Sequence, residues 1–298
     1  MTINAHPQLP EFEYIRPGTL MEASQFLAQH ASEARTLSGG TDIFVRMRNG
    51  FWRDKYLVDI KHLDGMGDIS FDPEAGLTIG AAVNMNRAHA YPAVQEYYHL
   101  LGDACRSVAS YQLRTRATII GNLCNASPAG DTIGACLVFN GILKVHGVNG
   151  FRDMPLAKFF IGPGKTALQP GDIVTVLHLP LPPEGSAGTY IKLGRNTRSD
   201  LAIVGVTVFG FPDTTATSGY SFRIALTSVA PIPLVASAAQ DYLATTFLTP
   251  EAFSKAAKLV AEACNPVDDV RASARYRRAM AHQLTEKALQ EIWTRLSR

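Results

Sequence analysis

A proline-rich segment near the middle of the chain most constrains its fold. Residues 180–186 read Pro-Leu-Pro-Pro-Glu-Gly-Ser, and a run with so many prolines interrupts both helices and central strands. The chain has 298 residues, and at roughly 100 to 200 residues per domain this length predicts two domains. We therefore expect one domain over residues 1–181 and a second over residues 187–298.

The first domain has the pattern of two consecutive α/β units. Thr19 and Glu22 form a capping box, which predicts a helix that begins near Leu20. Further helices are expected over residues 43–47, 100–110 and 132–139, and strands over 34–37, 55–60, 77–83, 142–146 and 172–179. The two subdomains therefore cover residues of about 1–62 and 63–181.

The second domain does not alternate strands and helices. Its strands come first along the chain and its helices follow. Strands are expected over residues 189–194, 201–211 and 220–229, and helices over 234–247, 250–264 and 273–296. Thr249 is the expected cap of the second of these helices. Consecutive strands followed by consecutive helices indicate α+β packing.

Charge and composition exclude several classes of function. Lys and Arg number 28 against 26 Asp and Glu, a formal net charge of +2, so the chain lacks the basic surplus that nucleic-acid binding uses. Only 18% of the residues are charged and 46% are hydrophobic, which leaves apolar surface for a protein partner. The longest apolar stretch, residues 201–211, is shorter than the roughly 18 residues that predict a membrane span.

The cysteines and histidines predict neither a metal site nor a disulfide framework. Cys105, Cys124, Cys136 and Cys264 lie far apart with no C-x-x-C pair, so the usual spacings for zinc or an iron–sulfur cluster are missing. The eight histidines form no H-E-x-x-H pattern. Because the first residues also lack a signal-peptide pattern, we expect a reducing, cytosolic location.

Two segments rich in small residues are candidates for binding an anion. The first, Ser-Gly-Gly-Thr-Asp at residues 38–42, lies between a predicted strand and a predicted helical turn. Glycines without Cβ let backbone N–H groups converge on a phosphate, and the helix would add its positive end. A plain tight turn is the alternative, and the loop by itself favours it.

The second segment, residues 117–131, is predicted to be a long structured loop before a helix. Its Gly121 and Asn122 offer donors, and Asp131 could cap the following helix or accept from a sugar hydroxyl. Taken alone, the helix cap is favoured for Asp131. Lys192 lies in a strand of alternating pattern, where a lysine most often belongs to a solvated face.

The order of seven sequence blocks resembles the flavoprotein (medium) subunit of molybdenum hydroxylases, the family of carbon monoxide dehydrogenase and xanthine dehydrogenase. The blocks are F-x-Y-x-x-P at 12–17, SGGTDI at 38–43, ATIIGNLCNASPAGDT at 117–132, FFIGPGKTALQPGDIVT at 159–175, YIKLGRNTRSDLAIVGV at 190–206, SVAPIPL at 228–234 and DVRASARYRRAM at 269–280. The resemblance implies an α+β fold. It consists of a p-cresol methylhydroxylase-type FAD-binding domain of two α/β subdomains, and a C-terminal domain with a three-stranded antiparallel sheet and helices.

The same resemblance implies where FAD lies. Its diphosphate is expected between the two glycine loops, the ribityl or ribose hydroxyls at Asp131, the adenine or flavin edge at Ile173 and Val174, and the isoalloxazine ring near Lys192. The residues that would hold FAD are Leu37, Ser38, Gly39, Gly40, Thr41, Asp42, Ile43, Ala117, Thr118, Gly121, Asn122, Cys124, Asp131, Ile173, Val174 and Lys192.

The implied activity is that of an FAD-dependent oxidoreductase subunit with no catalytic residue or metal ligand of its own. It would accept electrons from the [2Fe-2S] clusters of a small partner subunit and pass them to an external acceptor. The substrate would be oxidised at a molybdenum cofactor in a large partner subunit, in a dimer of heterotrimers. A self-contained flavin oxidoreductase of the same FAD-binding type is an alternative.

One departure from the family's pattern motivates a further alternative. The family's second loop reads T-I-G-G-N, whereas Ile120 stands here in place of the first glycine. If this position requires a positive φ, a β-branched residue is strained there. The alternative is then a non-catalytic assembly subunit whose flavin site has decayed.

Overall fold

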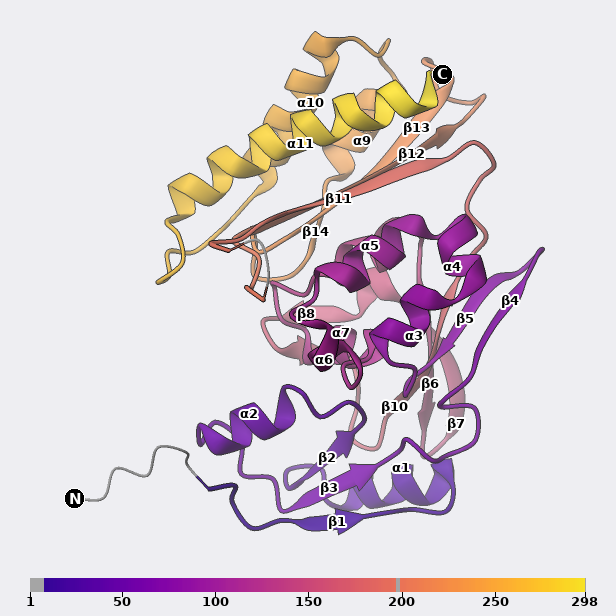
Figure 1. Cartoon of the computed structure of the whole chain (residues 1–298), viewed down its shortest axis with the longest axis vertical. Coiled ribbons are helices and arrows are strands. Elements are labelled where there is room, and N and C mark those ends of the chain that lie inside the picture. The colour runs from indigo at the N-terminus through magenta and orange to yellow at the C-terminus, as the bar shows by residue number, and fades with distance from the viewer. Residues whose placement is uncertain (1–7, 197–198, 298) are drawn as a thin grey trace.

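The computed structural model describes residues 8–196 and 199–297, arranged as three units along one long axis (Figure 1). We call them the N-terminal unit (residues 8–62), the middle unit (63–181) and the C-terminal unit (187–196 and 199–297). The proline-rich segment joins the last strand of the middle unit to the first strand of the C-terminal unit.

The N-terminal unit is a small parallel sheet with two helices. The strand order is β1 (Glu13–Ile15), β3 (Tyr56–Asp59), β2 (Ala34–Leu37), and the helices are α1 (Leu20–Gln29) and α2 (Ile43–Arg48). Both outer strands run parallel to β3 in the middle of the sheet. The glycine loop therefore begins directly at the end of β2.

Helix α1 begins where the capping box predicts. The Thr19 hydroxyl accepts a hydrogen bond from the Glu22 N–H at 3.1 Å, and the Glu22 carboxylate accepts one from the Gly18 N–H at 2.7 Å. These bonds satisfy donors that every helix start leaves open. The buried face of α1 packs towards β6 of the middle unit, where Ser24 Oγ lies 2.8 Å from His146 Nδ1. Helix α1 thereby holds the two units together.

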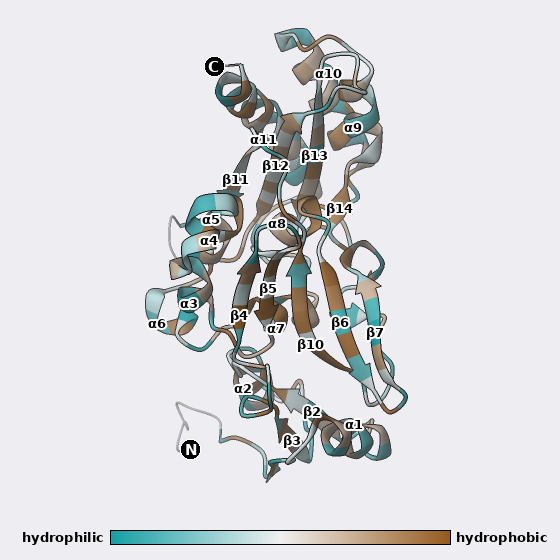
Figure 2. Ribbon diagram, turned by 90° about the vertical axis from the view of Figure 1, so that its right-hand side faces the viewer, coloured by the Kyte–Doolittle hydropathy of each residue, from teal (hydrophilic) through white to brown (hydrophobic). Residues whose placement is uncertain are grey.

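The middle unit is built on a five-stranded antiparallel sheet with helices gathered on one side of it (Figure 2). Its strand order is β4 (Ile69–Asp72), β5 (Gly76–Gly80), β10 (Ile173–Leu179), β6 (Ile142–Gly147), β7 (Gly150–Pro155), with a separate pair of β8 (Phe160–Gly162) and β9 (Lys165–Thr166). Its helices are α3 (Met85–Ala90), α4 (Pro92–Tyr97), α5 (His99–Ser107), α6 (Tyr111–Arg114), α7 (Ile119–Asn125) and α8 (Ile133–Val138), with a 3-10 turn at Leu156–Lys158.

The prediction of a continuous loop over residues 117–131 was wrong, because helix α7 forms inside it. The Thr118 hydroxyl caps this helix by accepting from the Gly121 N–H at 2.9 Å. Ile119, Ile120 and Leu123 bury its apolar face. The surrounding glycine, serine and proline residues hide this short helical pattern from a reading of composition.

The positive φ that would strain Ile120 is also absent. Ile120 has helical backbone and is not one of the described residues with a positive φ. Its side chain is only 4% exposed and belongs to the core of the first two units. A glycine is therefore not required at this position.

The C-terminal unit is an antiparallel sheet covered on one face by three helices (Figure 1). The strands follow the order β11 (Ala187–Leu193), β12 (Val204–Pro212), β13 (Tyr220–Thr227), β14 (Leu234–Val235), and the helices are α9 (Ser237–Ala244), α10 (Pro250–Ala263) and α11 (Ala274–Leu296). The α+β packing matches the order of elements predicted from the sequence, and Thr249 caps α10 as expected.

The predicted three-stranded sheet has a fourth, short strand. Leu234 and Val235, which were assigned to the start of a helix, pair with Leu226 and Ala225 at the edge of the sheet. Helix α9 begins only at Ser237. Edge pairing satisfies backbone groups of β13 that the first turn of a helix could not have reached.

The middle and C-terminal units meet in a close contact. Helix α8 packs against β12 and β13, and a Cβ on its Gly134 would lie well inside 3.0 Å of the Thr207 hydroxyl. Two hydrogen bonds also cross the contact, from Arg223 Nη1 to the Val138 carbonyl at 2.9 Å and from the Ser228 N–H to the Pro128 carbonyl at 2.6 Å.

No helix in the described residues is long and apolar enough to cross a bilayer.

Ile120→Gly should destabilise the protein by roughly 3–5 kcal/mol, because it removes a buried side chain and places glycine inside a helix. The matched change Val45→Gly affects an exposed helical residue, 55% accessible, and should cost only about 1 kcal/mol. Urea unfolding of both variants measures the two values. Unchanged stability in Ile120→Gly would contradict the packing described for this side chain.

Candidate functional site

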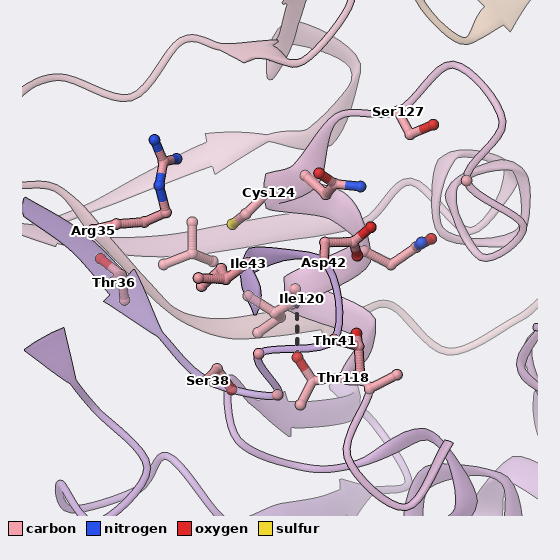
Figure 3. Close-up of a pocket in the computed structure, with 18 of the residues that line it drawn as sticks. Arg35, Thr36, Ser38, Thr41, Asp42, Ile43, Thr118, Ile120, Cys124 and Ser127 are labelled. Atoms are coloured by element: carbon pink, nitrogen blue, oxygen red, sulfur yellow. Dashed lines mark hydrogen bonds between the residues drawn. The ribbon is translucent and has the colours of Figure 1, made fainter. Parts of the chain in front are cut away.

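A cavity of about 760 Å³ is lined mainly by residues of the N-terminal and middle units (Figure 3). Its wall includes Arg35 and Trp52 of the N-terminal unit, and Ser199, Asp200 and Leu201 of the C-terminal unit. The volume falls in the range of about 300–1,000 Å³ that is typical of small-molecule and cofactor sites. All three units therefore contribute to its wall.

The two glycine-containing loops meet at Gly39. A Cβ on Gly39 would lie well inside 3.0 Å of the Arg116 carbonyl oxygen and 3.2 Å from the Ala117 Cα. Gly40, next to it, has φ +74°, a conformation that L side chains rarely adopt. The first glycine permits the two loops to touch and the second permits the turn. The pair is thus required by backbone geometry, independently of any ligand.

Side chains of the two loops gather around the same part of the cavity. Figure 3 shows Ser38, Thr41 and Thr118 near one another, with Ile120 beside them. The Ser38 hydroxyl donates to the Ala81 carbonyl at 2.9 Å, which fixes the start of the first loop. In the second loop the Gly121 and Asn122 N–H groups already bond to Thr118, at 2.9 and 3.0 Å. The backbone donors expected for a ligand are therefore those of the first loop.

The second loop is held by its own polar side chains. Asn122 Oδ1 accepts from the Thr132 hydroxyl at 2.7 Å, which ties α7 to the start of α8. Asn125 Oδ1 is buried and has no hydrogen-bond partner in the described residues, and Asn125 lines the cavity. Burial raises the pKa of the Cys124 thiol to about 12, so this cavity residue stays a neutral thiol and not a nucleophile.

A buried ion pair joins the cavity wall to the C-terminal unit. Lys192 Nζ lies 2.8 Å from Asp131 Oδ2, and the Tyr190 hydroxyl donates to Asp131 Oδ1 at 2.7 Å. Lys192 also donates to the Ser107 carbonyl at 3.0 Å. Burial raises the pKa of Asp131, while Lys192 and the hydrogen bonds oppose that rise. Burial and the Asp131 carboxylate raise the pKa of Tyr190 well above its ordinary value.

This arrangement corrects two expectations drawn from the residues alone. Asp131 does not cap the following helix, because Thr132 is the N-cap of α8 and no side chain bonds to it there. Lys192 is not on a solvated face, since its side chain is 15% exposed. Every residue of β11 is half-buried, so the strand has no solvated face, and helix α5 of the middle unit packs against it.

The structure brings together most of the residues expected around a cofactor. Those that line the cavity are Ser38, Gly39, Gly40, Thr41, Asp42, Ile43, Ala117, Thr118, Gly121, Asn122, Cys124, Asp131, Ile173 and Val174. Leu37 does not line it, because its side chain packs in a small core with Met47 and Leu57. Lys192 does not line it either, and its ammonium group reaches the cavity wall only through Asp131.

Sequence reasoning missed several residues of the cavity wall. Arg35, Arg46 and Trp52 line it, and both guanidinium groups lie over the Trp52 ring. Other unexpected contributions come from the turn at residues 168–172 and from residues 199–201. No spacing pattern connects these segments, so only the fold reveals them. No cluster of His, Cys, Asp or Glu suited to a metal occurs in the residues that the structure describes.

Comparisons with known proteins agree with this architecture. The family described as the FAD binding domain in molybdopterin dehydrogenase matches residues 10–182, and the CO dehydrogenase flavoprotein C-terminal domain matches residues 189–292. The chain is 32% identical over 286 residues to the carbon monoxide dehydrogenase medium chain of Hydrogenophaga pseudoflava, covering 96% of this chain and 98% of that one. It is 27% identical over 279 residues to the xanthine dehydrogenase FAD-binding subunit of Escherichia coli O157:H7, covering 93% and 94% of the two chains.

Solved structures give the same result. A chain of carbon monoxide dehydrogenase from Hydrogenophaga pseudoflava superposes with a TM-score of 0.91 at 32% identity, covering 97% of this chain and 99% of that one. A chain of carbon monoxide dehydrogenase from Oligotropha carboxidovorans superposes with a TM-score of 0.90 at 27% identity, covering 97% and 100%. The expected α+β fold, with an FAD-binding domain followed by a flavoprotein C-terminal domain, is confirmed.

Lys192→Met should lower the free energy of unfolding by about 3 kcal/mol near neutral pH, because it leaves the Asp131 carboxylate buried and unpaired. Removal of the lysine raises the pKa of Asp131 further above its unfolded value of about 3.9. Destabilisation relative to wild type should therefore be smallest in acid and grow as pH rises through the folded pKa. Urea unfolding between pH 4.5 and 8 measures this dependence.

The matched control for this variant is Lys144→Met, which alters an exposed lysine in strand β6. It should change stability by less than about 0.5 kcal/mol at every pH. A loss in Lys192→Met that stays constant with pH would contradict the role assigned to the pair.

Proposed function

The chain belongs to the family of FAD-binding subunits of molybdopterin dehydrogenases, and from this premise we propose that it is the electron-transferring flavoprotein of a molybdenum hydroxylase complex. It is an FAD-dependent oxidoreductase subunit by membership. In the proposal it accepts electrons from [2Fe-2S] clusters of a small subunit and passes them to an external acceptor. A large subunit carries the molybdenum cofactor, and the complex is a dimer of heterotrimers.

The residues that would hold FAD are those of the two loops that meet at Gly39. Two phosphate groups buried without a metal need several convergent N–H donors, and both loops lie in the wall of the cavity. Gly121 and Asn122 line the same wall, but their N–H groups already bond to Thr118. The side-chain amide nitrogen of Asn122 is the donor that this pair can offer. The unpartnered Asn125 Oδ1 supplies an acceptor in the same wall. The donors and acceptors of the cavity wall therefore fit a dinucleotide. This fit is the observation on which the proposal rests.

FAD supplies the redox chemistry when it is bound, because its ring takes up electrons singly or in pairs. The protein's part is to orient the ring, exclude water and place charge beside it. Asp131 lies at the cavity wall with its charge balanced by Lys192, so the pair fixes a polar wall without adding net charge. The Cys124 thiol stays neutral because burial raises its pKa to about 12, so it would not act as a nucleophile towards the cofactor.

The hypothesis of a decayed flavin site rested on strain at Ile120, and the helical backbone there removes that reason. No specific contact in the described residues favours a self-contained oxidoreductase. The domain boundary between residues 181 and 187 and the cytosolic location stay predictions. All four cysteines are free thiols in the structure.

Gly39→Ala should weaken FAD binding at least tenfold, because the added Cβ pushes the first loop away from the Arg116 carbonyl. The control Gly67→Ala adds a Cβ in open space at an ordinary φ and should keep wild-type affinity. Flavin fluorescence titration of the full chain gives both dissociation constants. Equal affinities would refute the placement of the diphosphate between the loops.

The complex itself is tested by affinity purification of the tagged chain from its native host. We expect two further subunits, one containing molybdenum and one with the spectrum of [2Fe-2S] clusters. The flavin absorbance should bleach on addition of an oxidisable substrate only in that complex. If the isolated chain oxidises an organic substrate at the same rate as the complex, the self-contained alternative is correct instead.

A further inference from the structure

Two of the seven sequence blocks, residues 228–234 and 269–280, are fully described by the structure yet contribute nothing to the wall of the cavity. Both blocks meet at Arg277, which lies in the first turn of α11 and is only 2% exposed. Its Nη2 donates to Asp269 Oδ1 at 2.7 Å, and its Nη1 donates to the Ser228 carbonyl at 3.2 Å. We call Ser228, Asp269 and Arg277 the Arg277 cluster. One buried guanidinium therefore joins the two blocks.

The Arg277 cluster holds the backbone that directly follows the cavity wall of the C-terminal unit. Arg277 Nη1 also donates to the Ile203 carbonyl at 2.5 Å, and the Ser228 hydroxyl donates to the Ala202 carbonyl at 2.9 Å. Leu201, the residue before these two carbonyls, lines the cavity. The wall segment 199–201 is therefore attached at its end to α11, although α11 itself does not reach the cavity.

The same cluster is bonded to the second glycine loop. The Ser228 N–H donates to the Pro128 carbonyl at 2.6 Å, and the residues that follow, Ala129 to Asp131, line the cavity. Ser228 thus uses its N–H for one wall segment and its hydroxyl for the other, while its carbonyl accepts from Arg277. A single residue therefore joins the wall segments 127–131 and 199–201.

The backbone of Ser228 supports this interpretation. Ser228 has φ +65°, in the left-handed region. A residue other than glycine keeps such a conformation only where its surroundings determine it. The bonds to Pro128, Ala202 and Arg277 are these surroundings, because they hold the N–H, the hydroxyl and the carbonyl at once. The conformation is therefore coupled to the positions of both wall segments.

A contribution to stability alone does not explain why a guanidinium occupies this position. Arg277 Nε is buried and has no hydrogen-bond partner in the part of the chain that the structure describes, and a buried unsatisfied donor costs free energy. A buried ion pair often stabilises a protein no more than apolar side chains of similar volume do. A planar guanidinium does supply several hydrogen bonds in fixed directions. Arg277 uses them to hold two backbone carbonyls and a carboxylate in one arrangement.

Resting on the proposed function, we propose that Arg277 and Ser228 are positioning residues for the flavin ring. They set the distance between the wall segments 127–131 and 199–201 without touching the cofactor. Both segments lie beside the Asp131–Lys192 pair, because Asp131 ends the first and the Ile203 N–H after the second donates to the Leu193 carbonyl at 2.7 Å. None of these bonds involves the first glycine loop. The cluster therefore acts on the flavin half of FAD and leaves its adenosine diphosphate half unaffected.

The experiment measures binding to the full chain freed of flavin, in the variants Ser228→Gly, Arg277→Lys and the control Arg275→Lys. Ser228→Gly removes only the hydroxyl bond, and glycine adopts this φ without strain, so the variant should fold with a urea midpoint close to that of wild type. Arg277→Lys keeps the charge but loses the planar fork. Arg275 is exposed, two residues earlier in the same helix. The probes are FAD and riboflavin by fluorescence titration, and ADP by competition with FAD.

Ser228→Gly should weaken FAD and riboflavin by roughly threefold to tenfold, the equivalent of one hydrogen bond. Arg277→Lys should weaken both by about tenfold or more, because it loosens both segments. ADP affinity should stay within about twofold of wild type in both variants, since ADP lacks the flavin. The absorption band of the bound flavin should also shift towards that of FAD in water, because a loosened wall admits water to the ring. Arg275→Lys should behave as wild type throughout.

Two results would overturn the inference while leaving the proposed function intact. One is wild-type FAD affinity and an unchanged flavin spectrum in Ser228→Gly, which decides the question even if Arg277→Lys fails to fold. The other is an equal loss for FAD and ADP, which would mean that the cluster only stabilises the fold. A folded wild-type chain that binds neither FAD nor ADP would instead overturn the proposed function, and this inference with it.

Discussion

The contact between the two loops at Gly39 is the constraint on which the rest of the site depends. The backbone of the first loop lies so close to the Arg116 carbonyl that no side chain fits between them. This approach closes one wall of the cavity and brings the start of α7 opposite the end of β2. Convergent N–H donors can serve a buried diphosphate only when two backbone segments are this close. A glycine loop alone would have remained an ordinary turn.

A second constraint joins the cavity to the C-terminal unit. The buried pair of Lys192 and Asp131 crosses from β11 to the segment before α8, and Tyr190 shares the same carboxylate. A carboxylate buried to this degree stays ionised near neutral pH only with such partners. The C-terminal unit therefore has a part in the electrostatics of the cavity as well as in covering the middle unit. This ion pair adds to the packing of α8 against β12 and β13, which also joins the C-terminal unit to the middle unit.

Local signals predicted elements well where the sequence itself contains the determining contact. The capping box at Thr19 is of this kind, since its hydrogen bonds join residues three and four positions apart. Predictions failed where long-range packing decided the structure. The short strand at Leu234 exists because the edge of β13 is available to it. Helix α7 escaped notice because small residues surround its three buried apolar side chains.

The sequence by itself determined the family, the order of elements and the two loops, because block order and local capping are properties of the linear chain. It also supplied most of the residues that line the cavity. Only the tertiary structure decided that Lys192 lies behind Asp131, that Ile120 is unstrained, and that Arg46 and Trp52 reach the cavity wall. These facts depend on which faces of distant elements meet. Burial and ion pairing are set by neighbours in space, and spacing along the chain does not encode them.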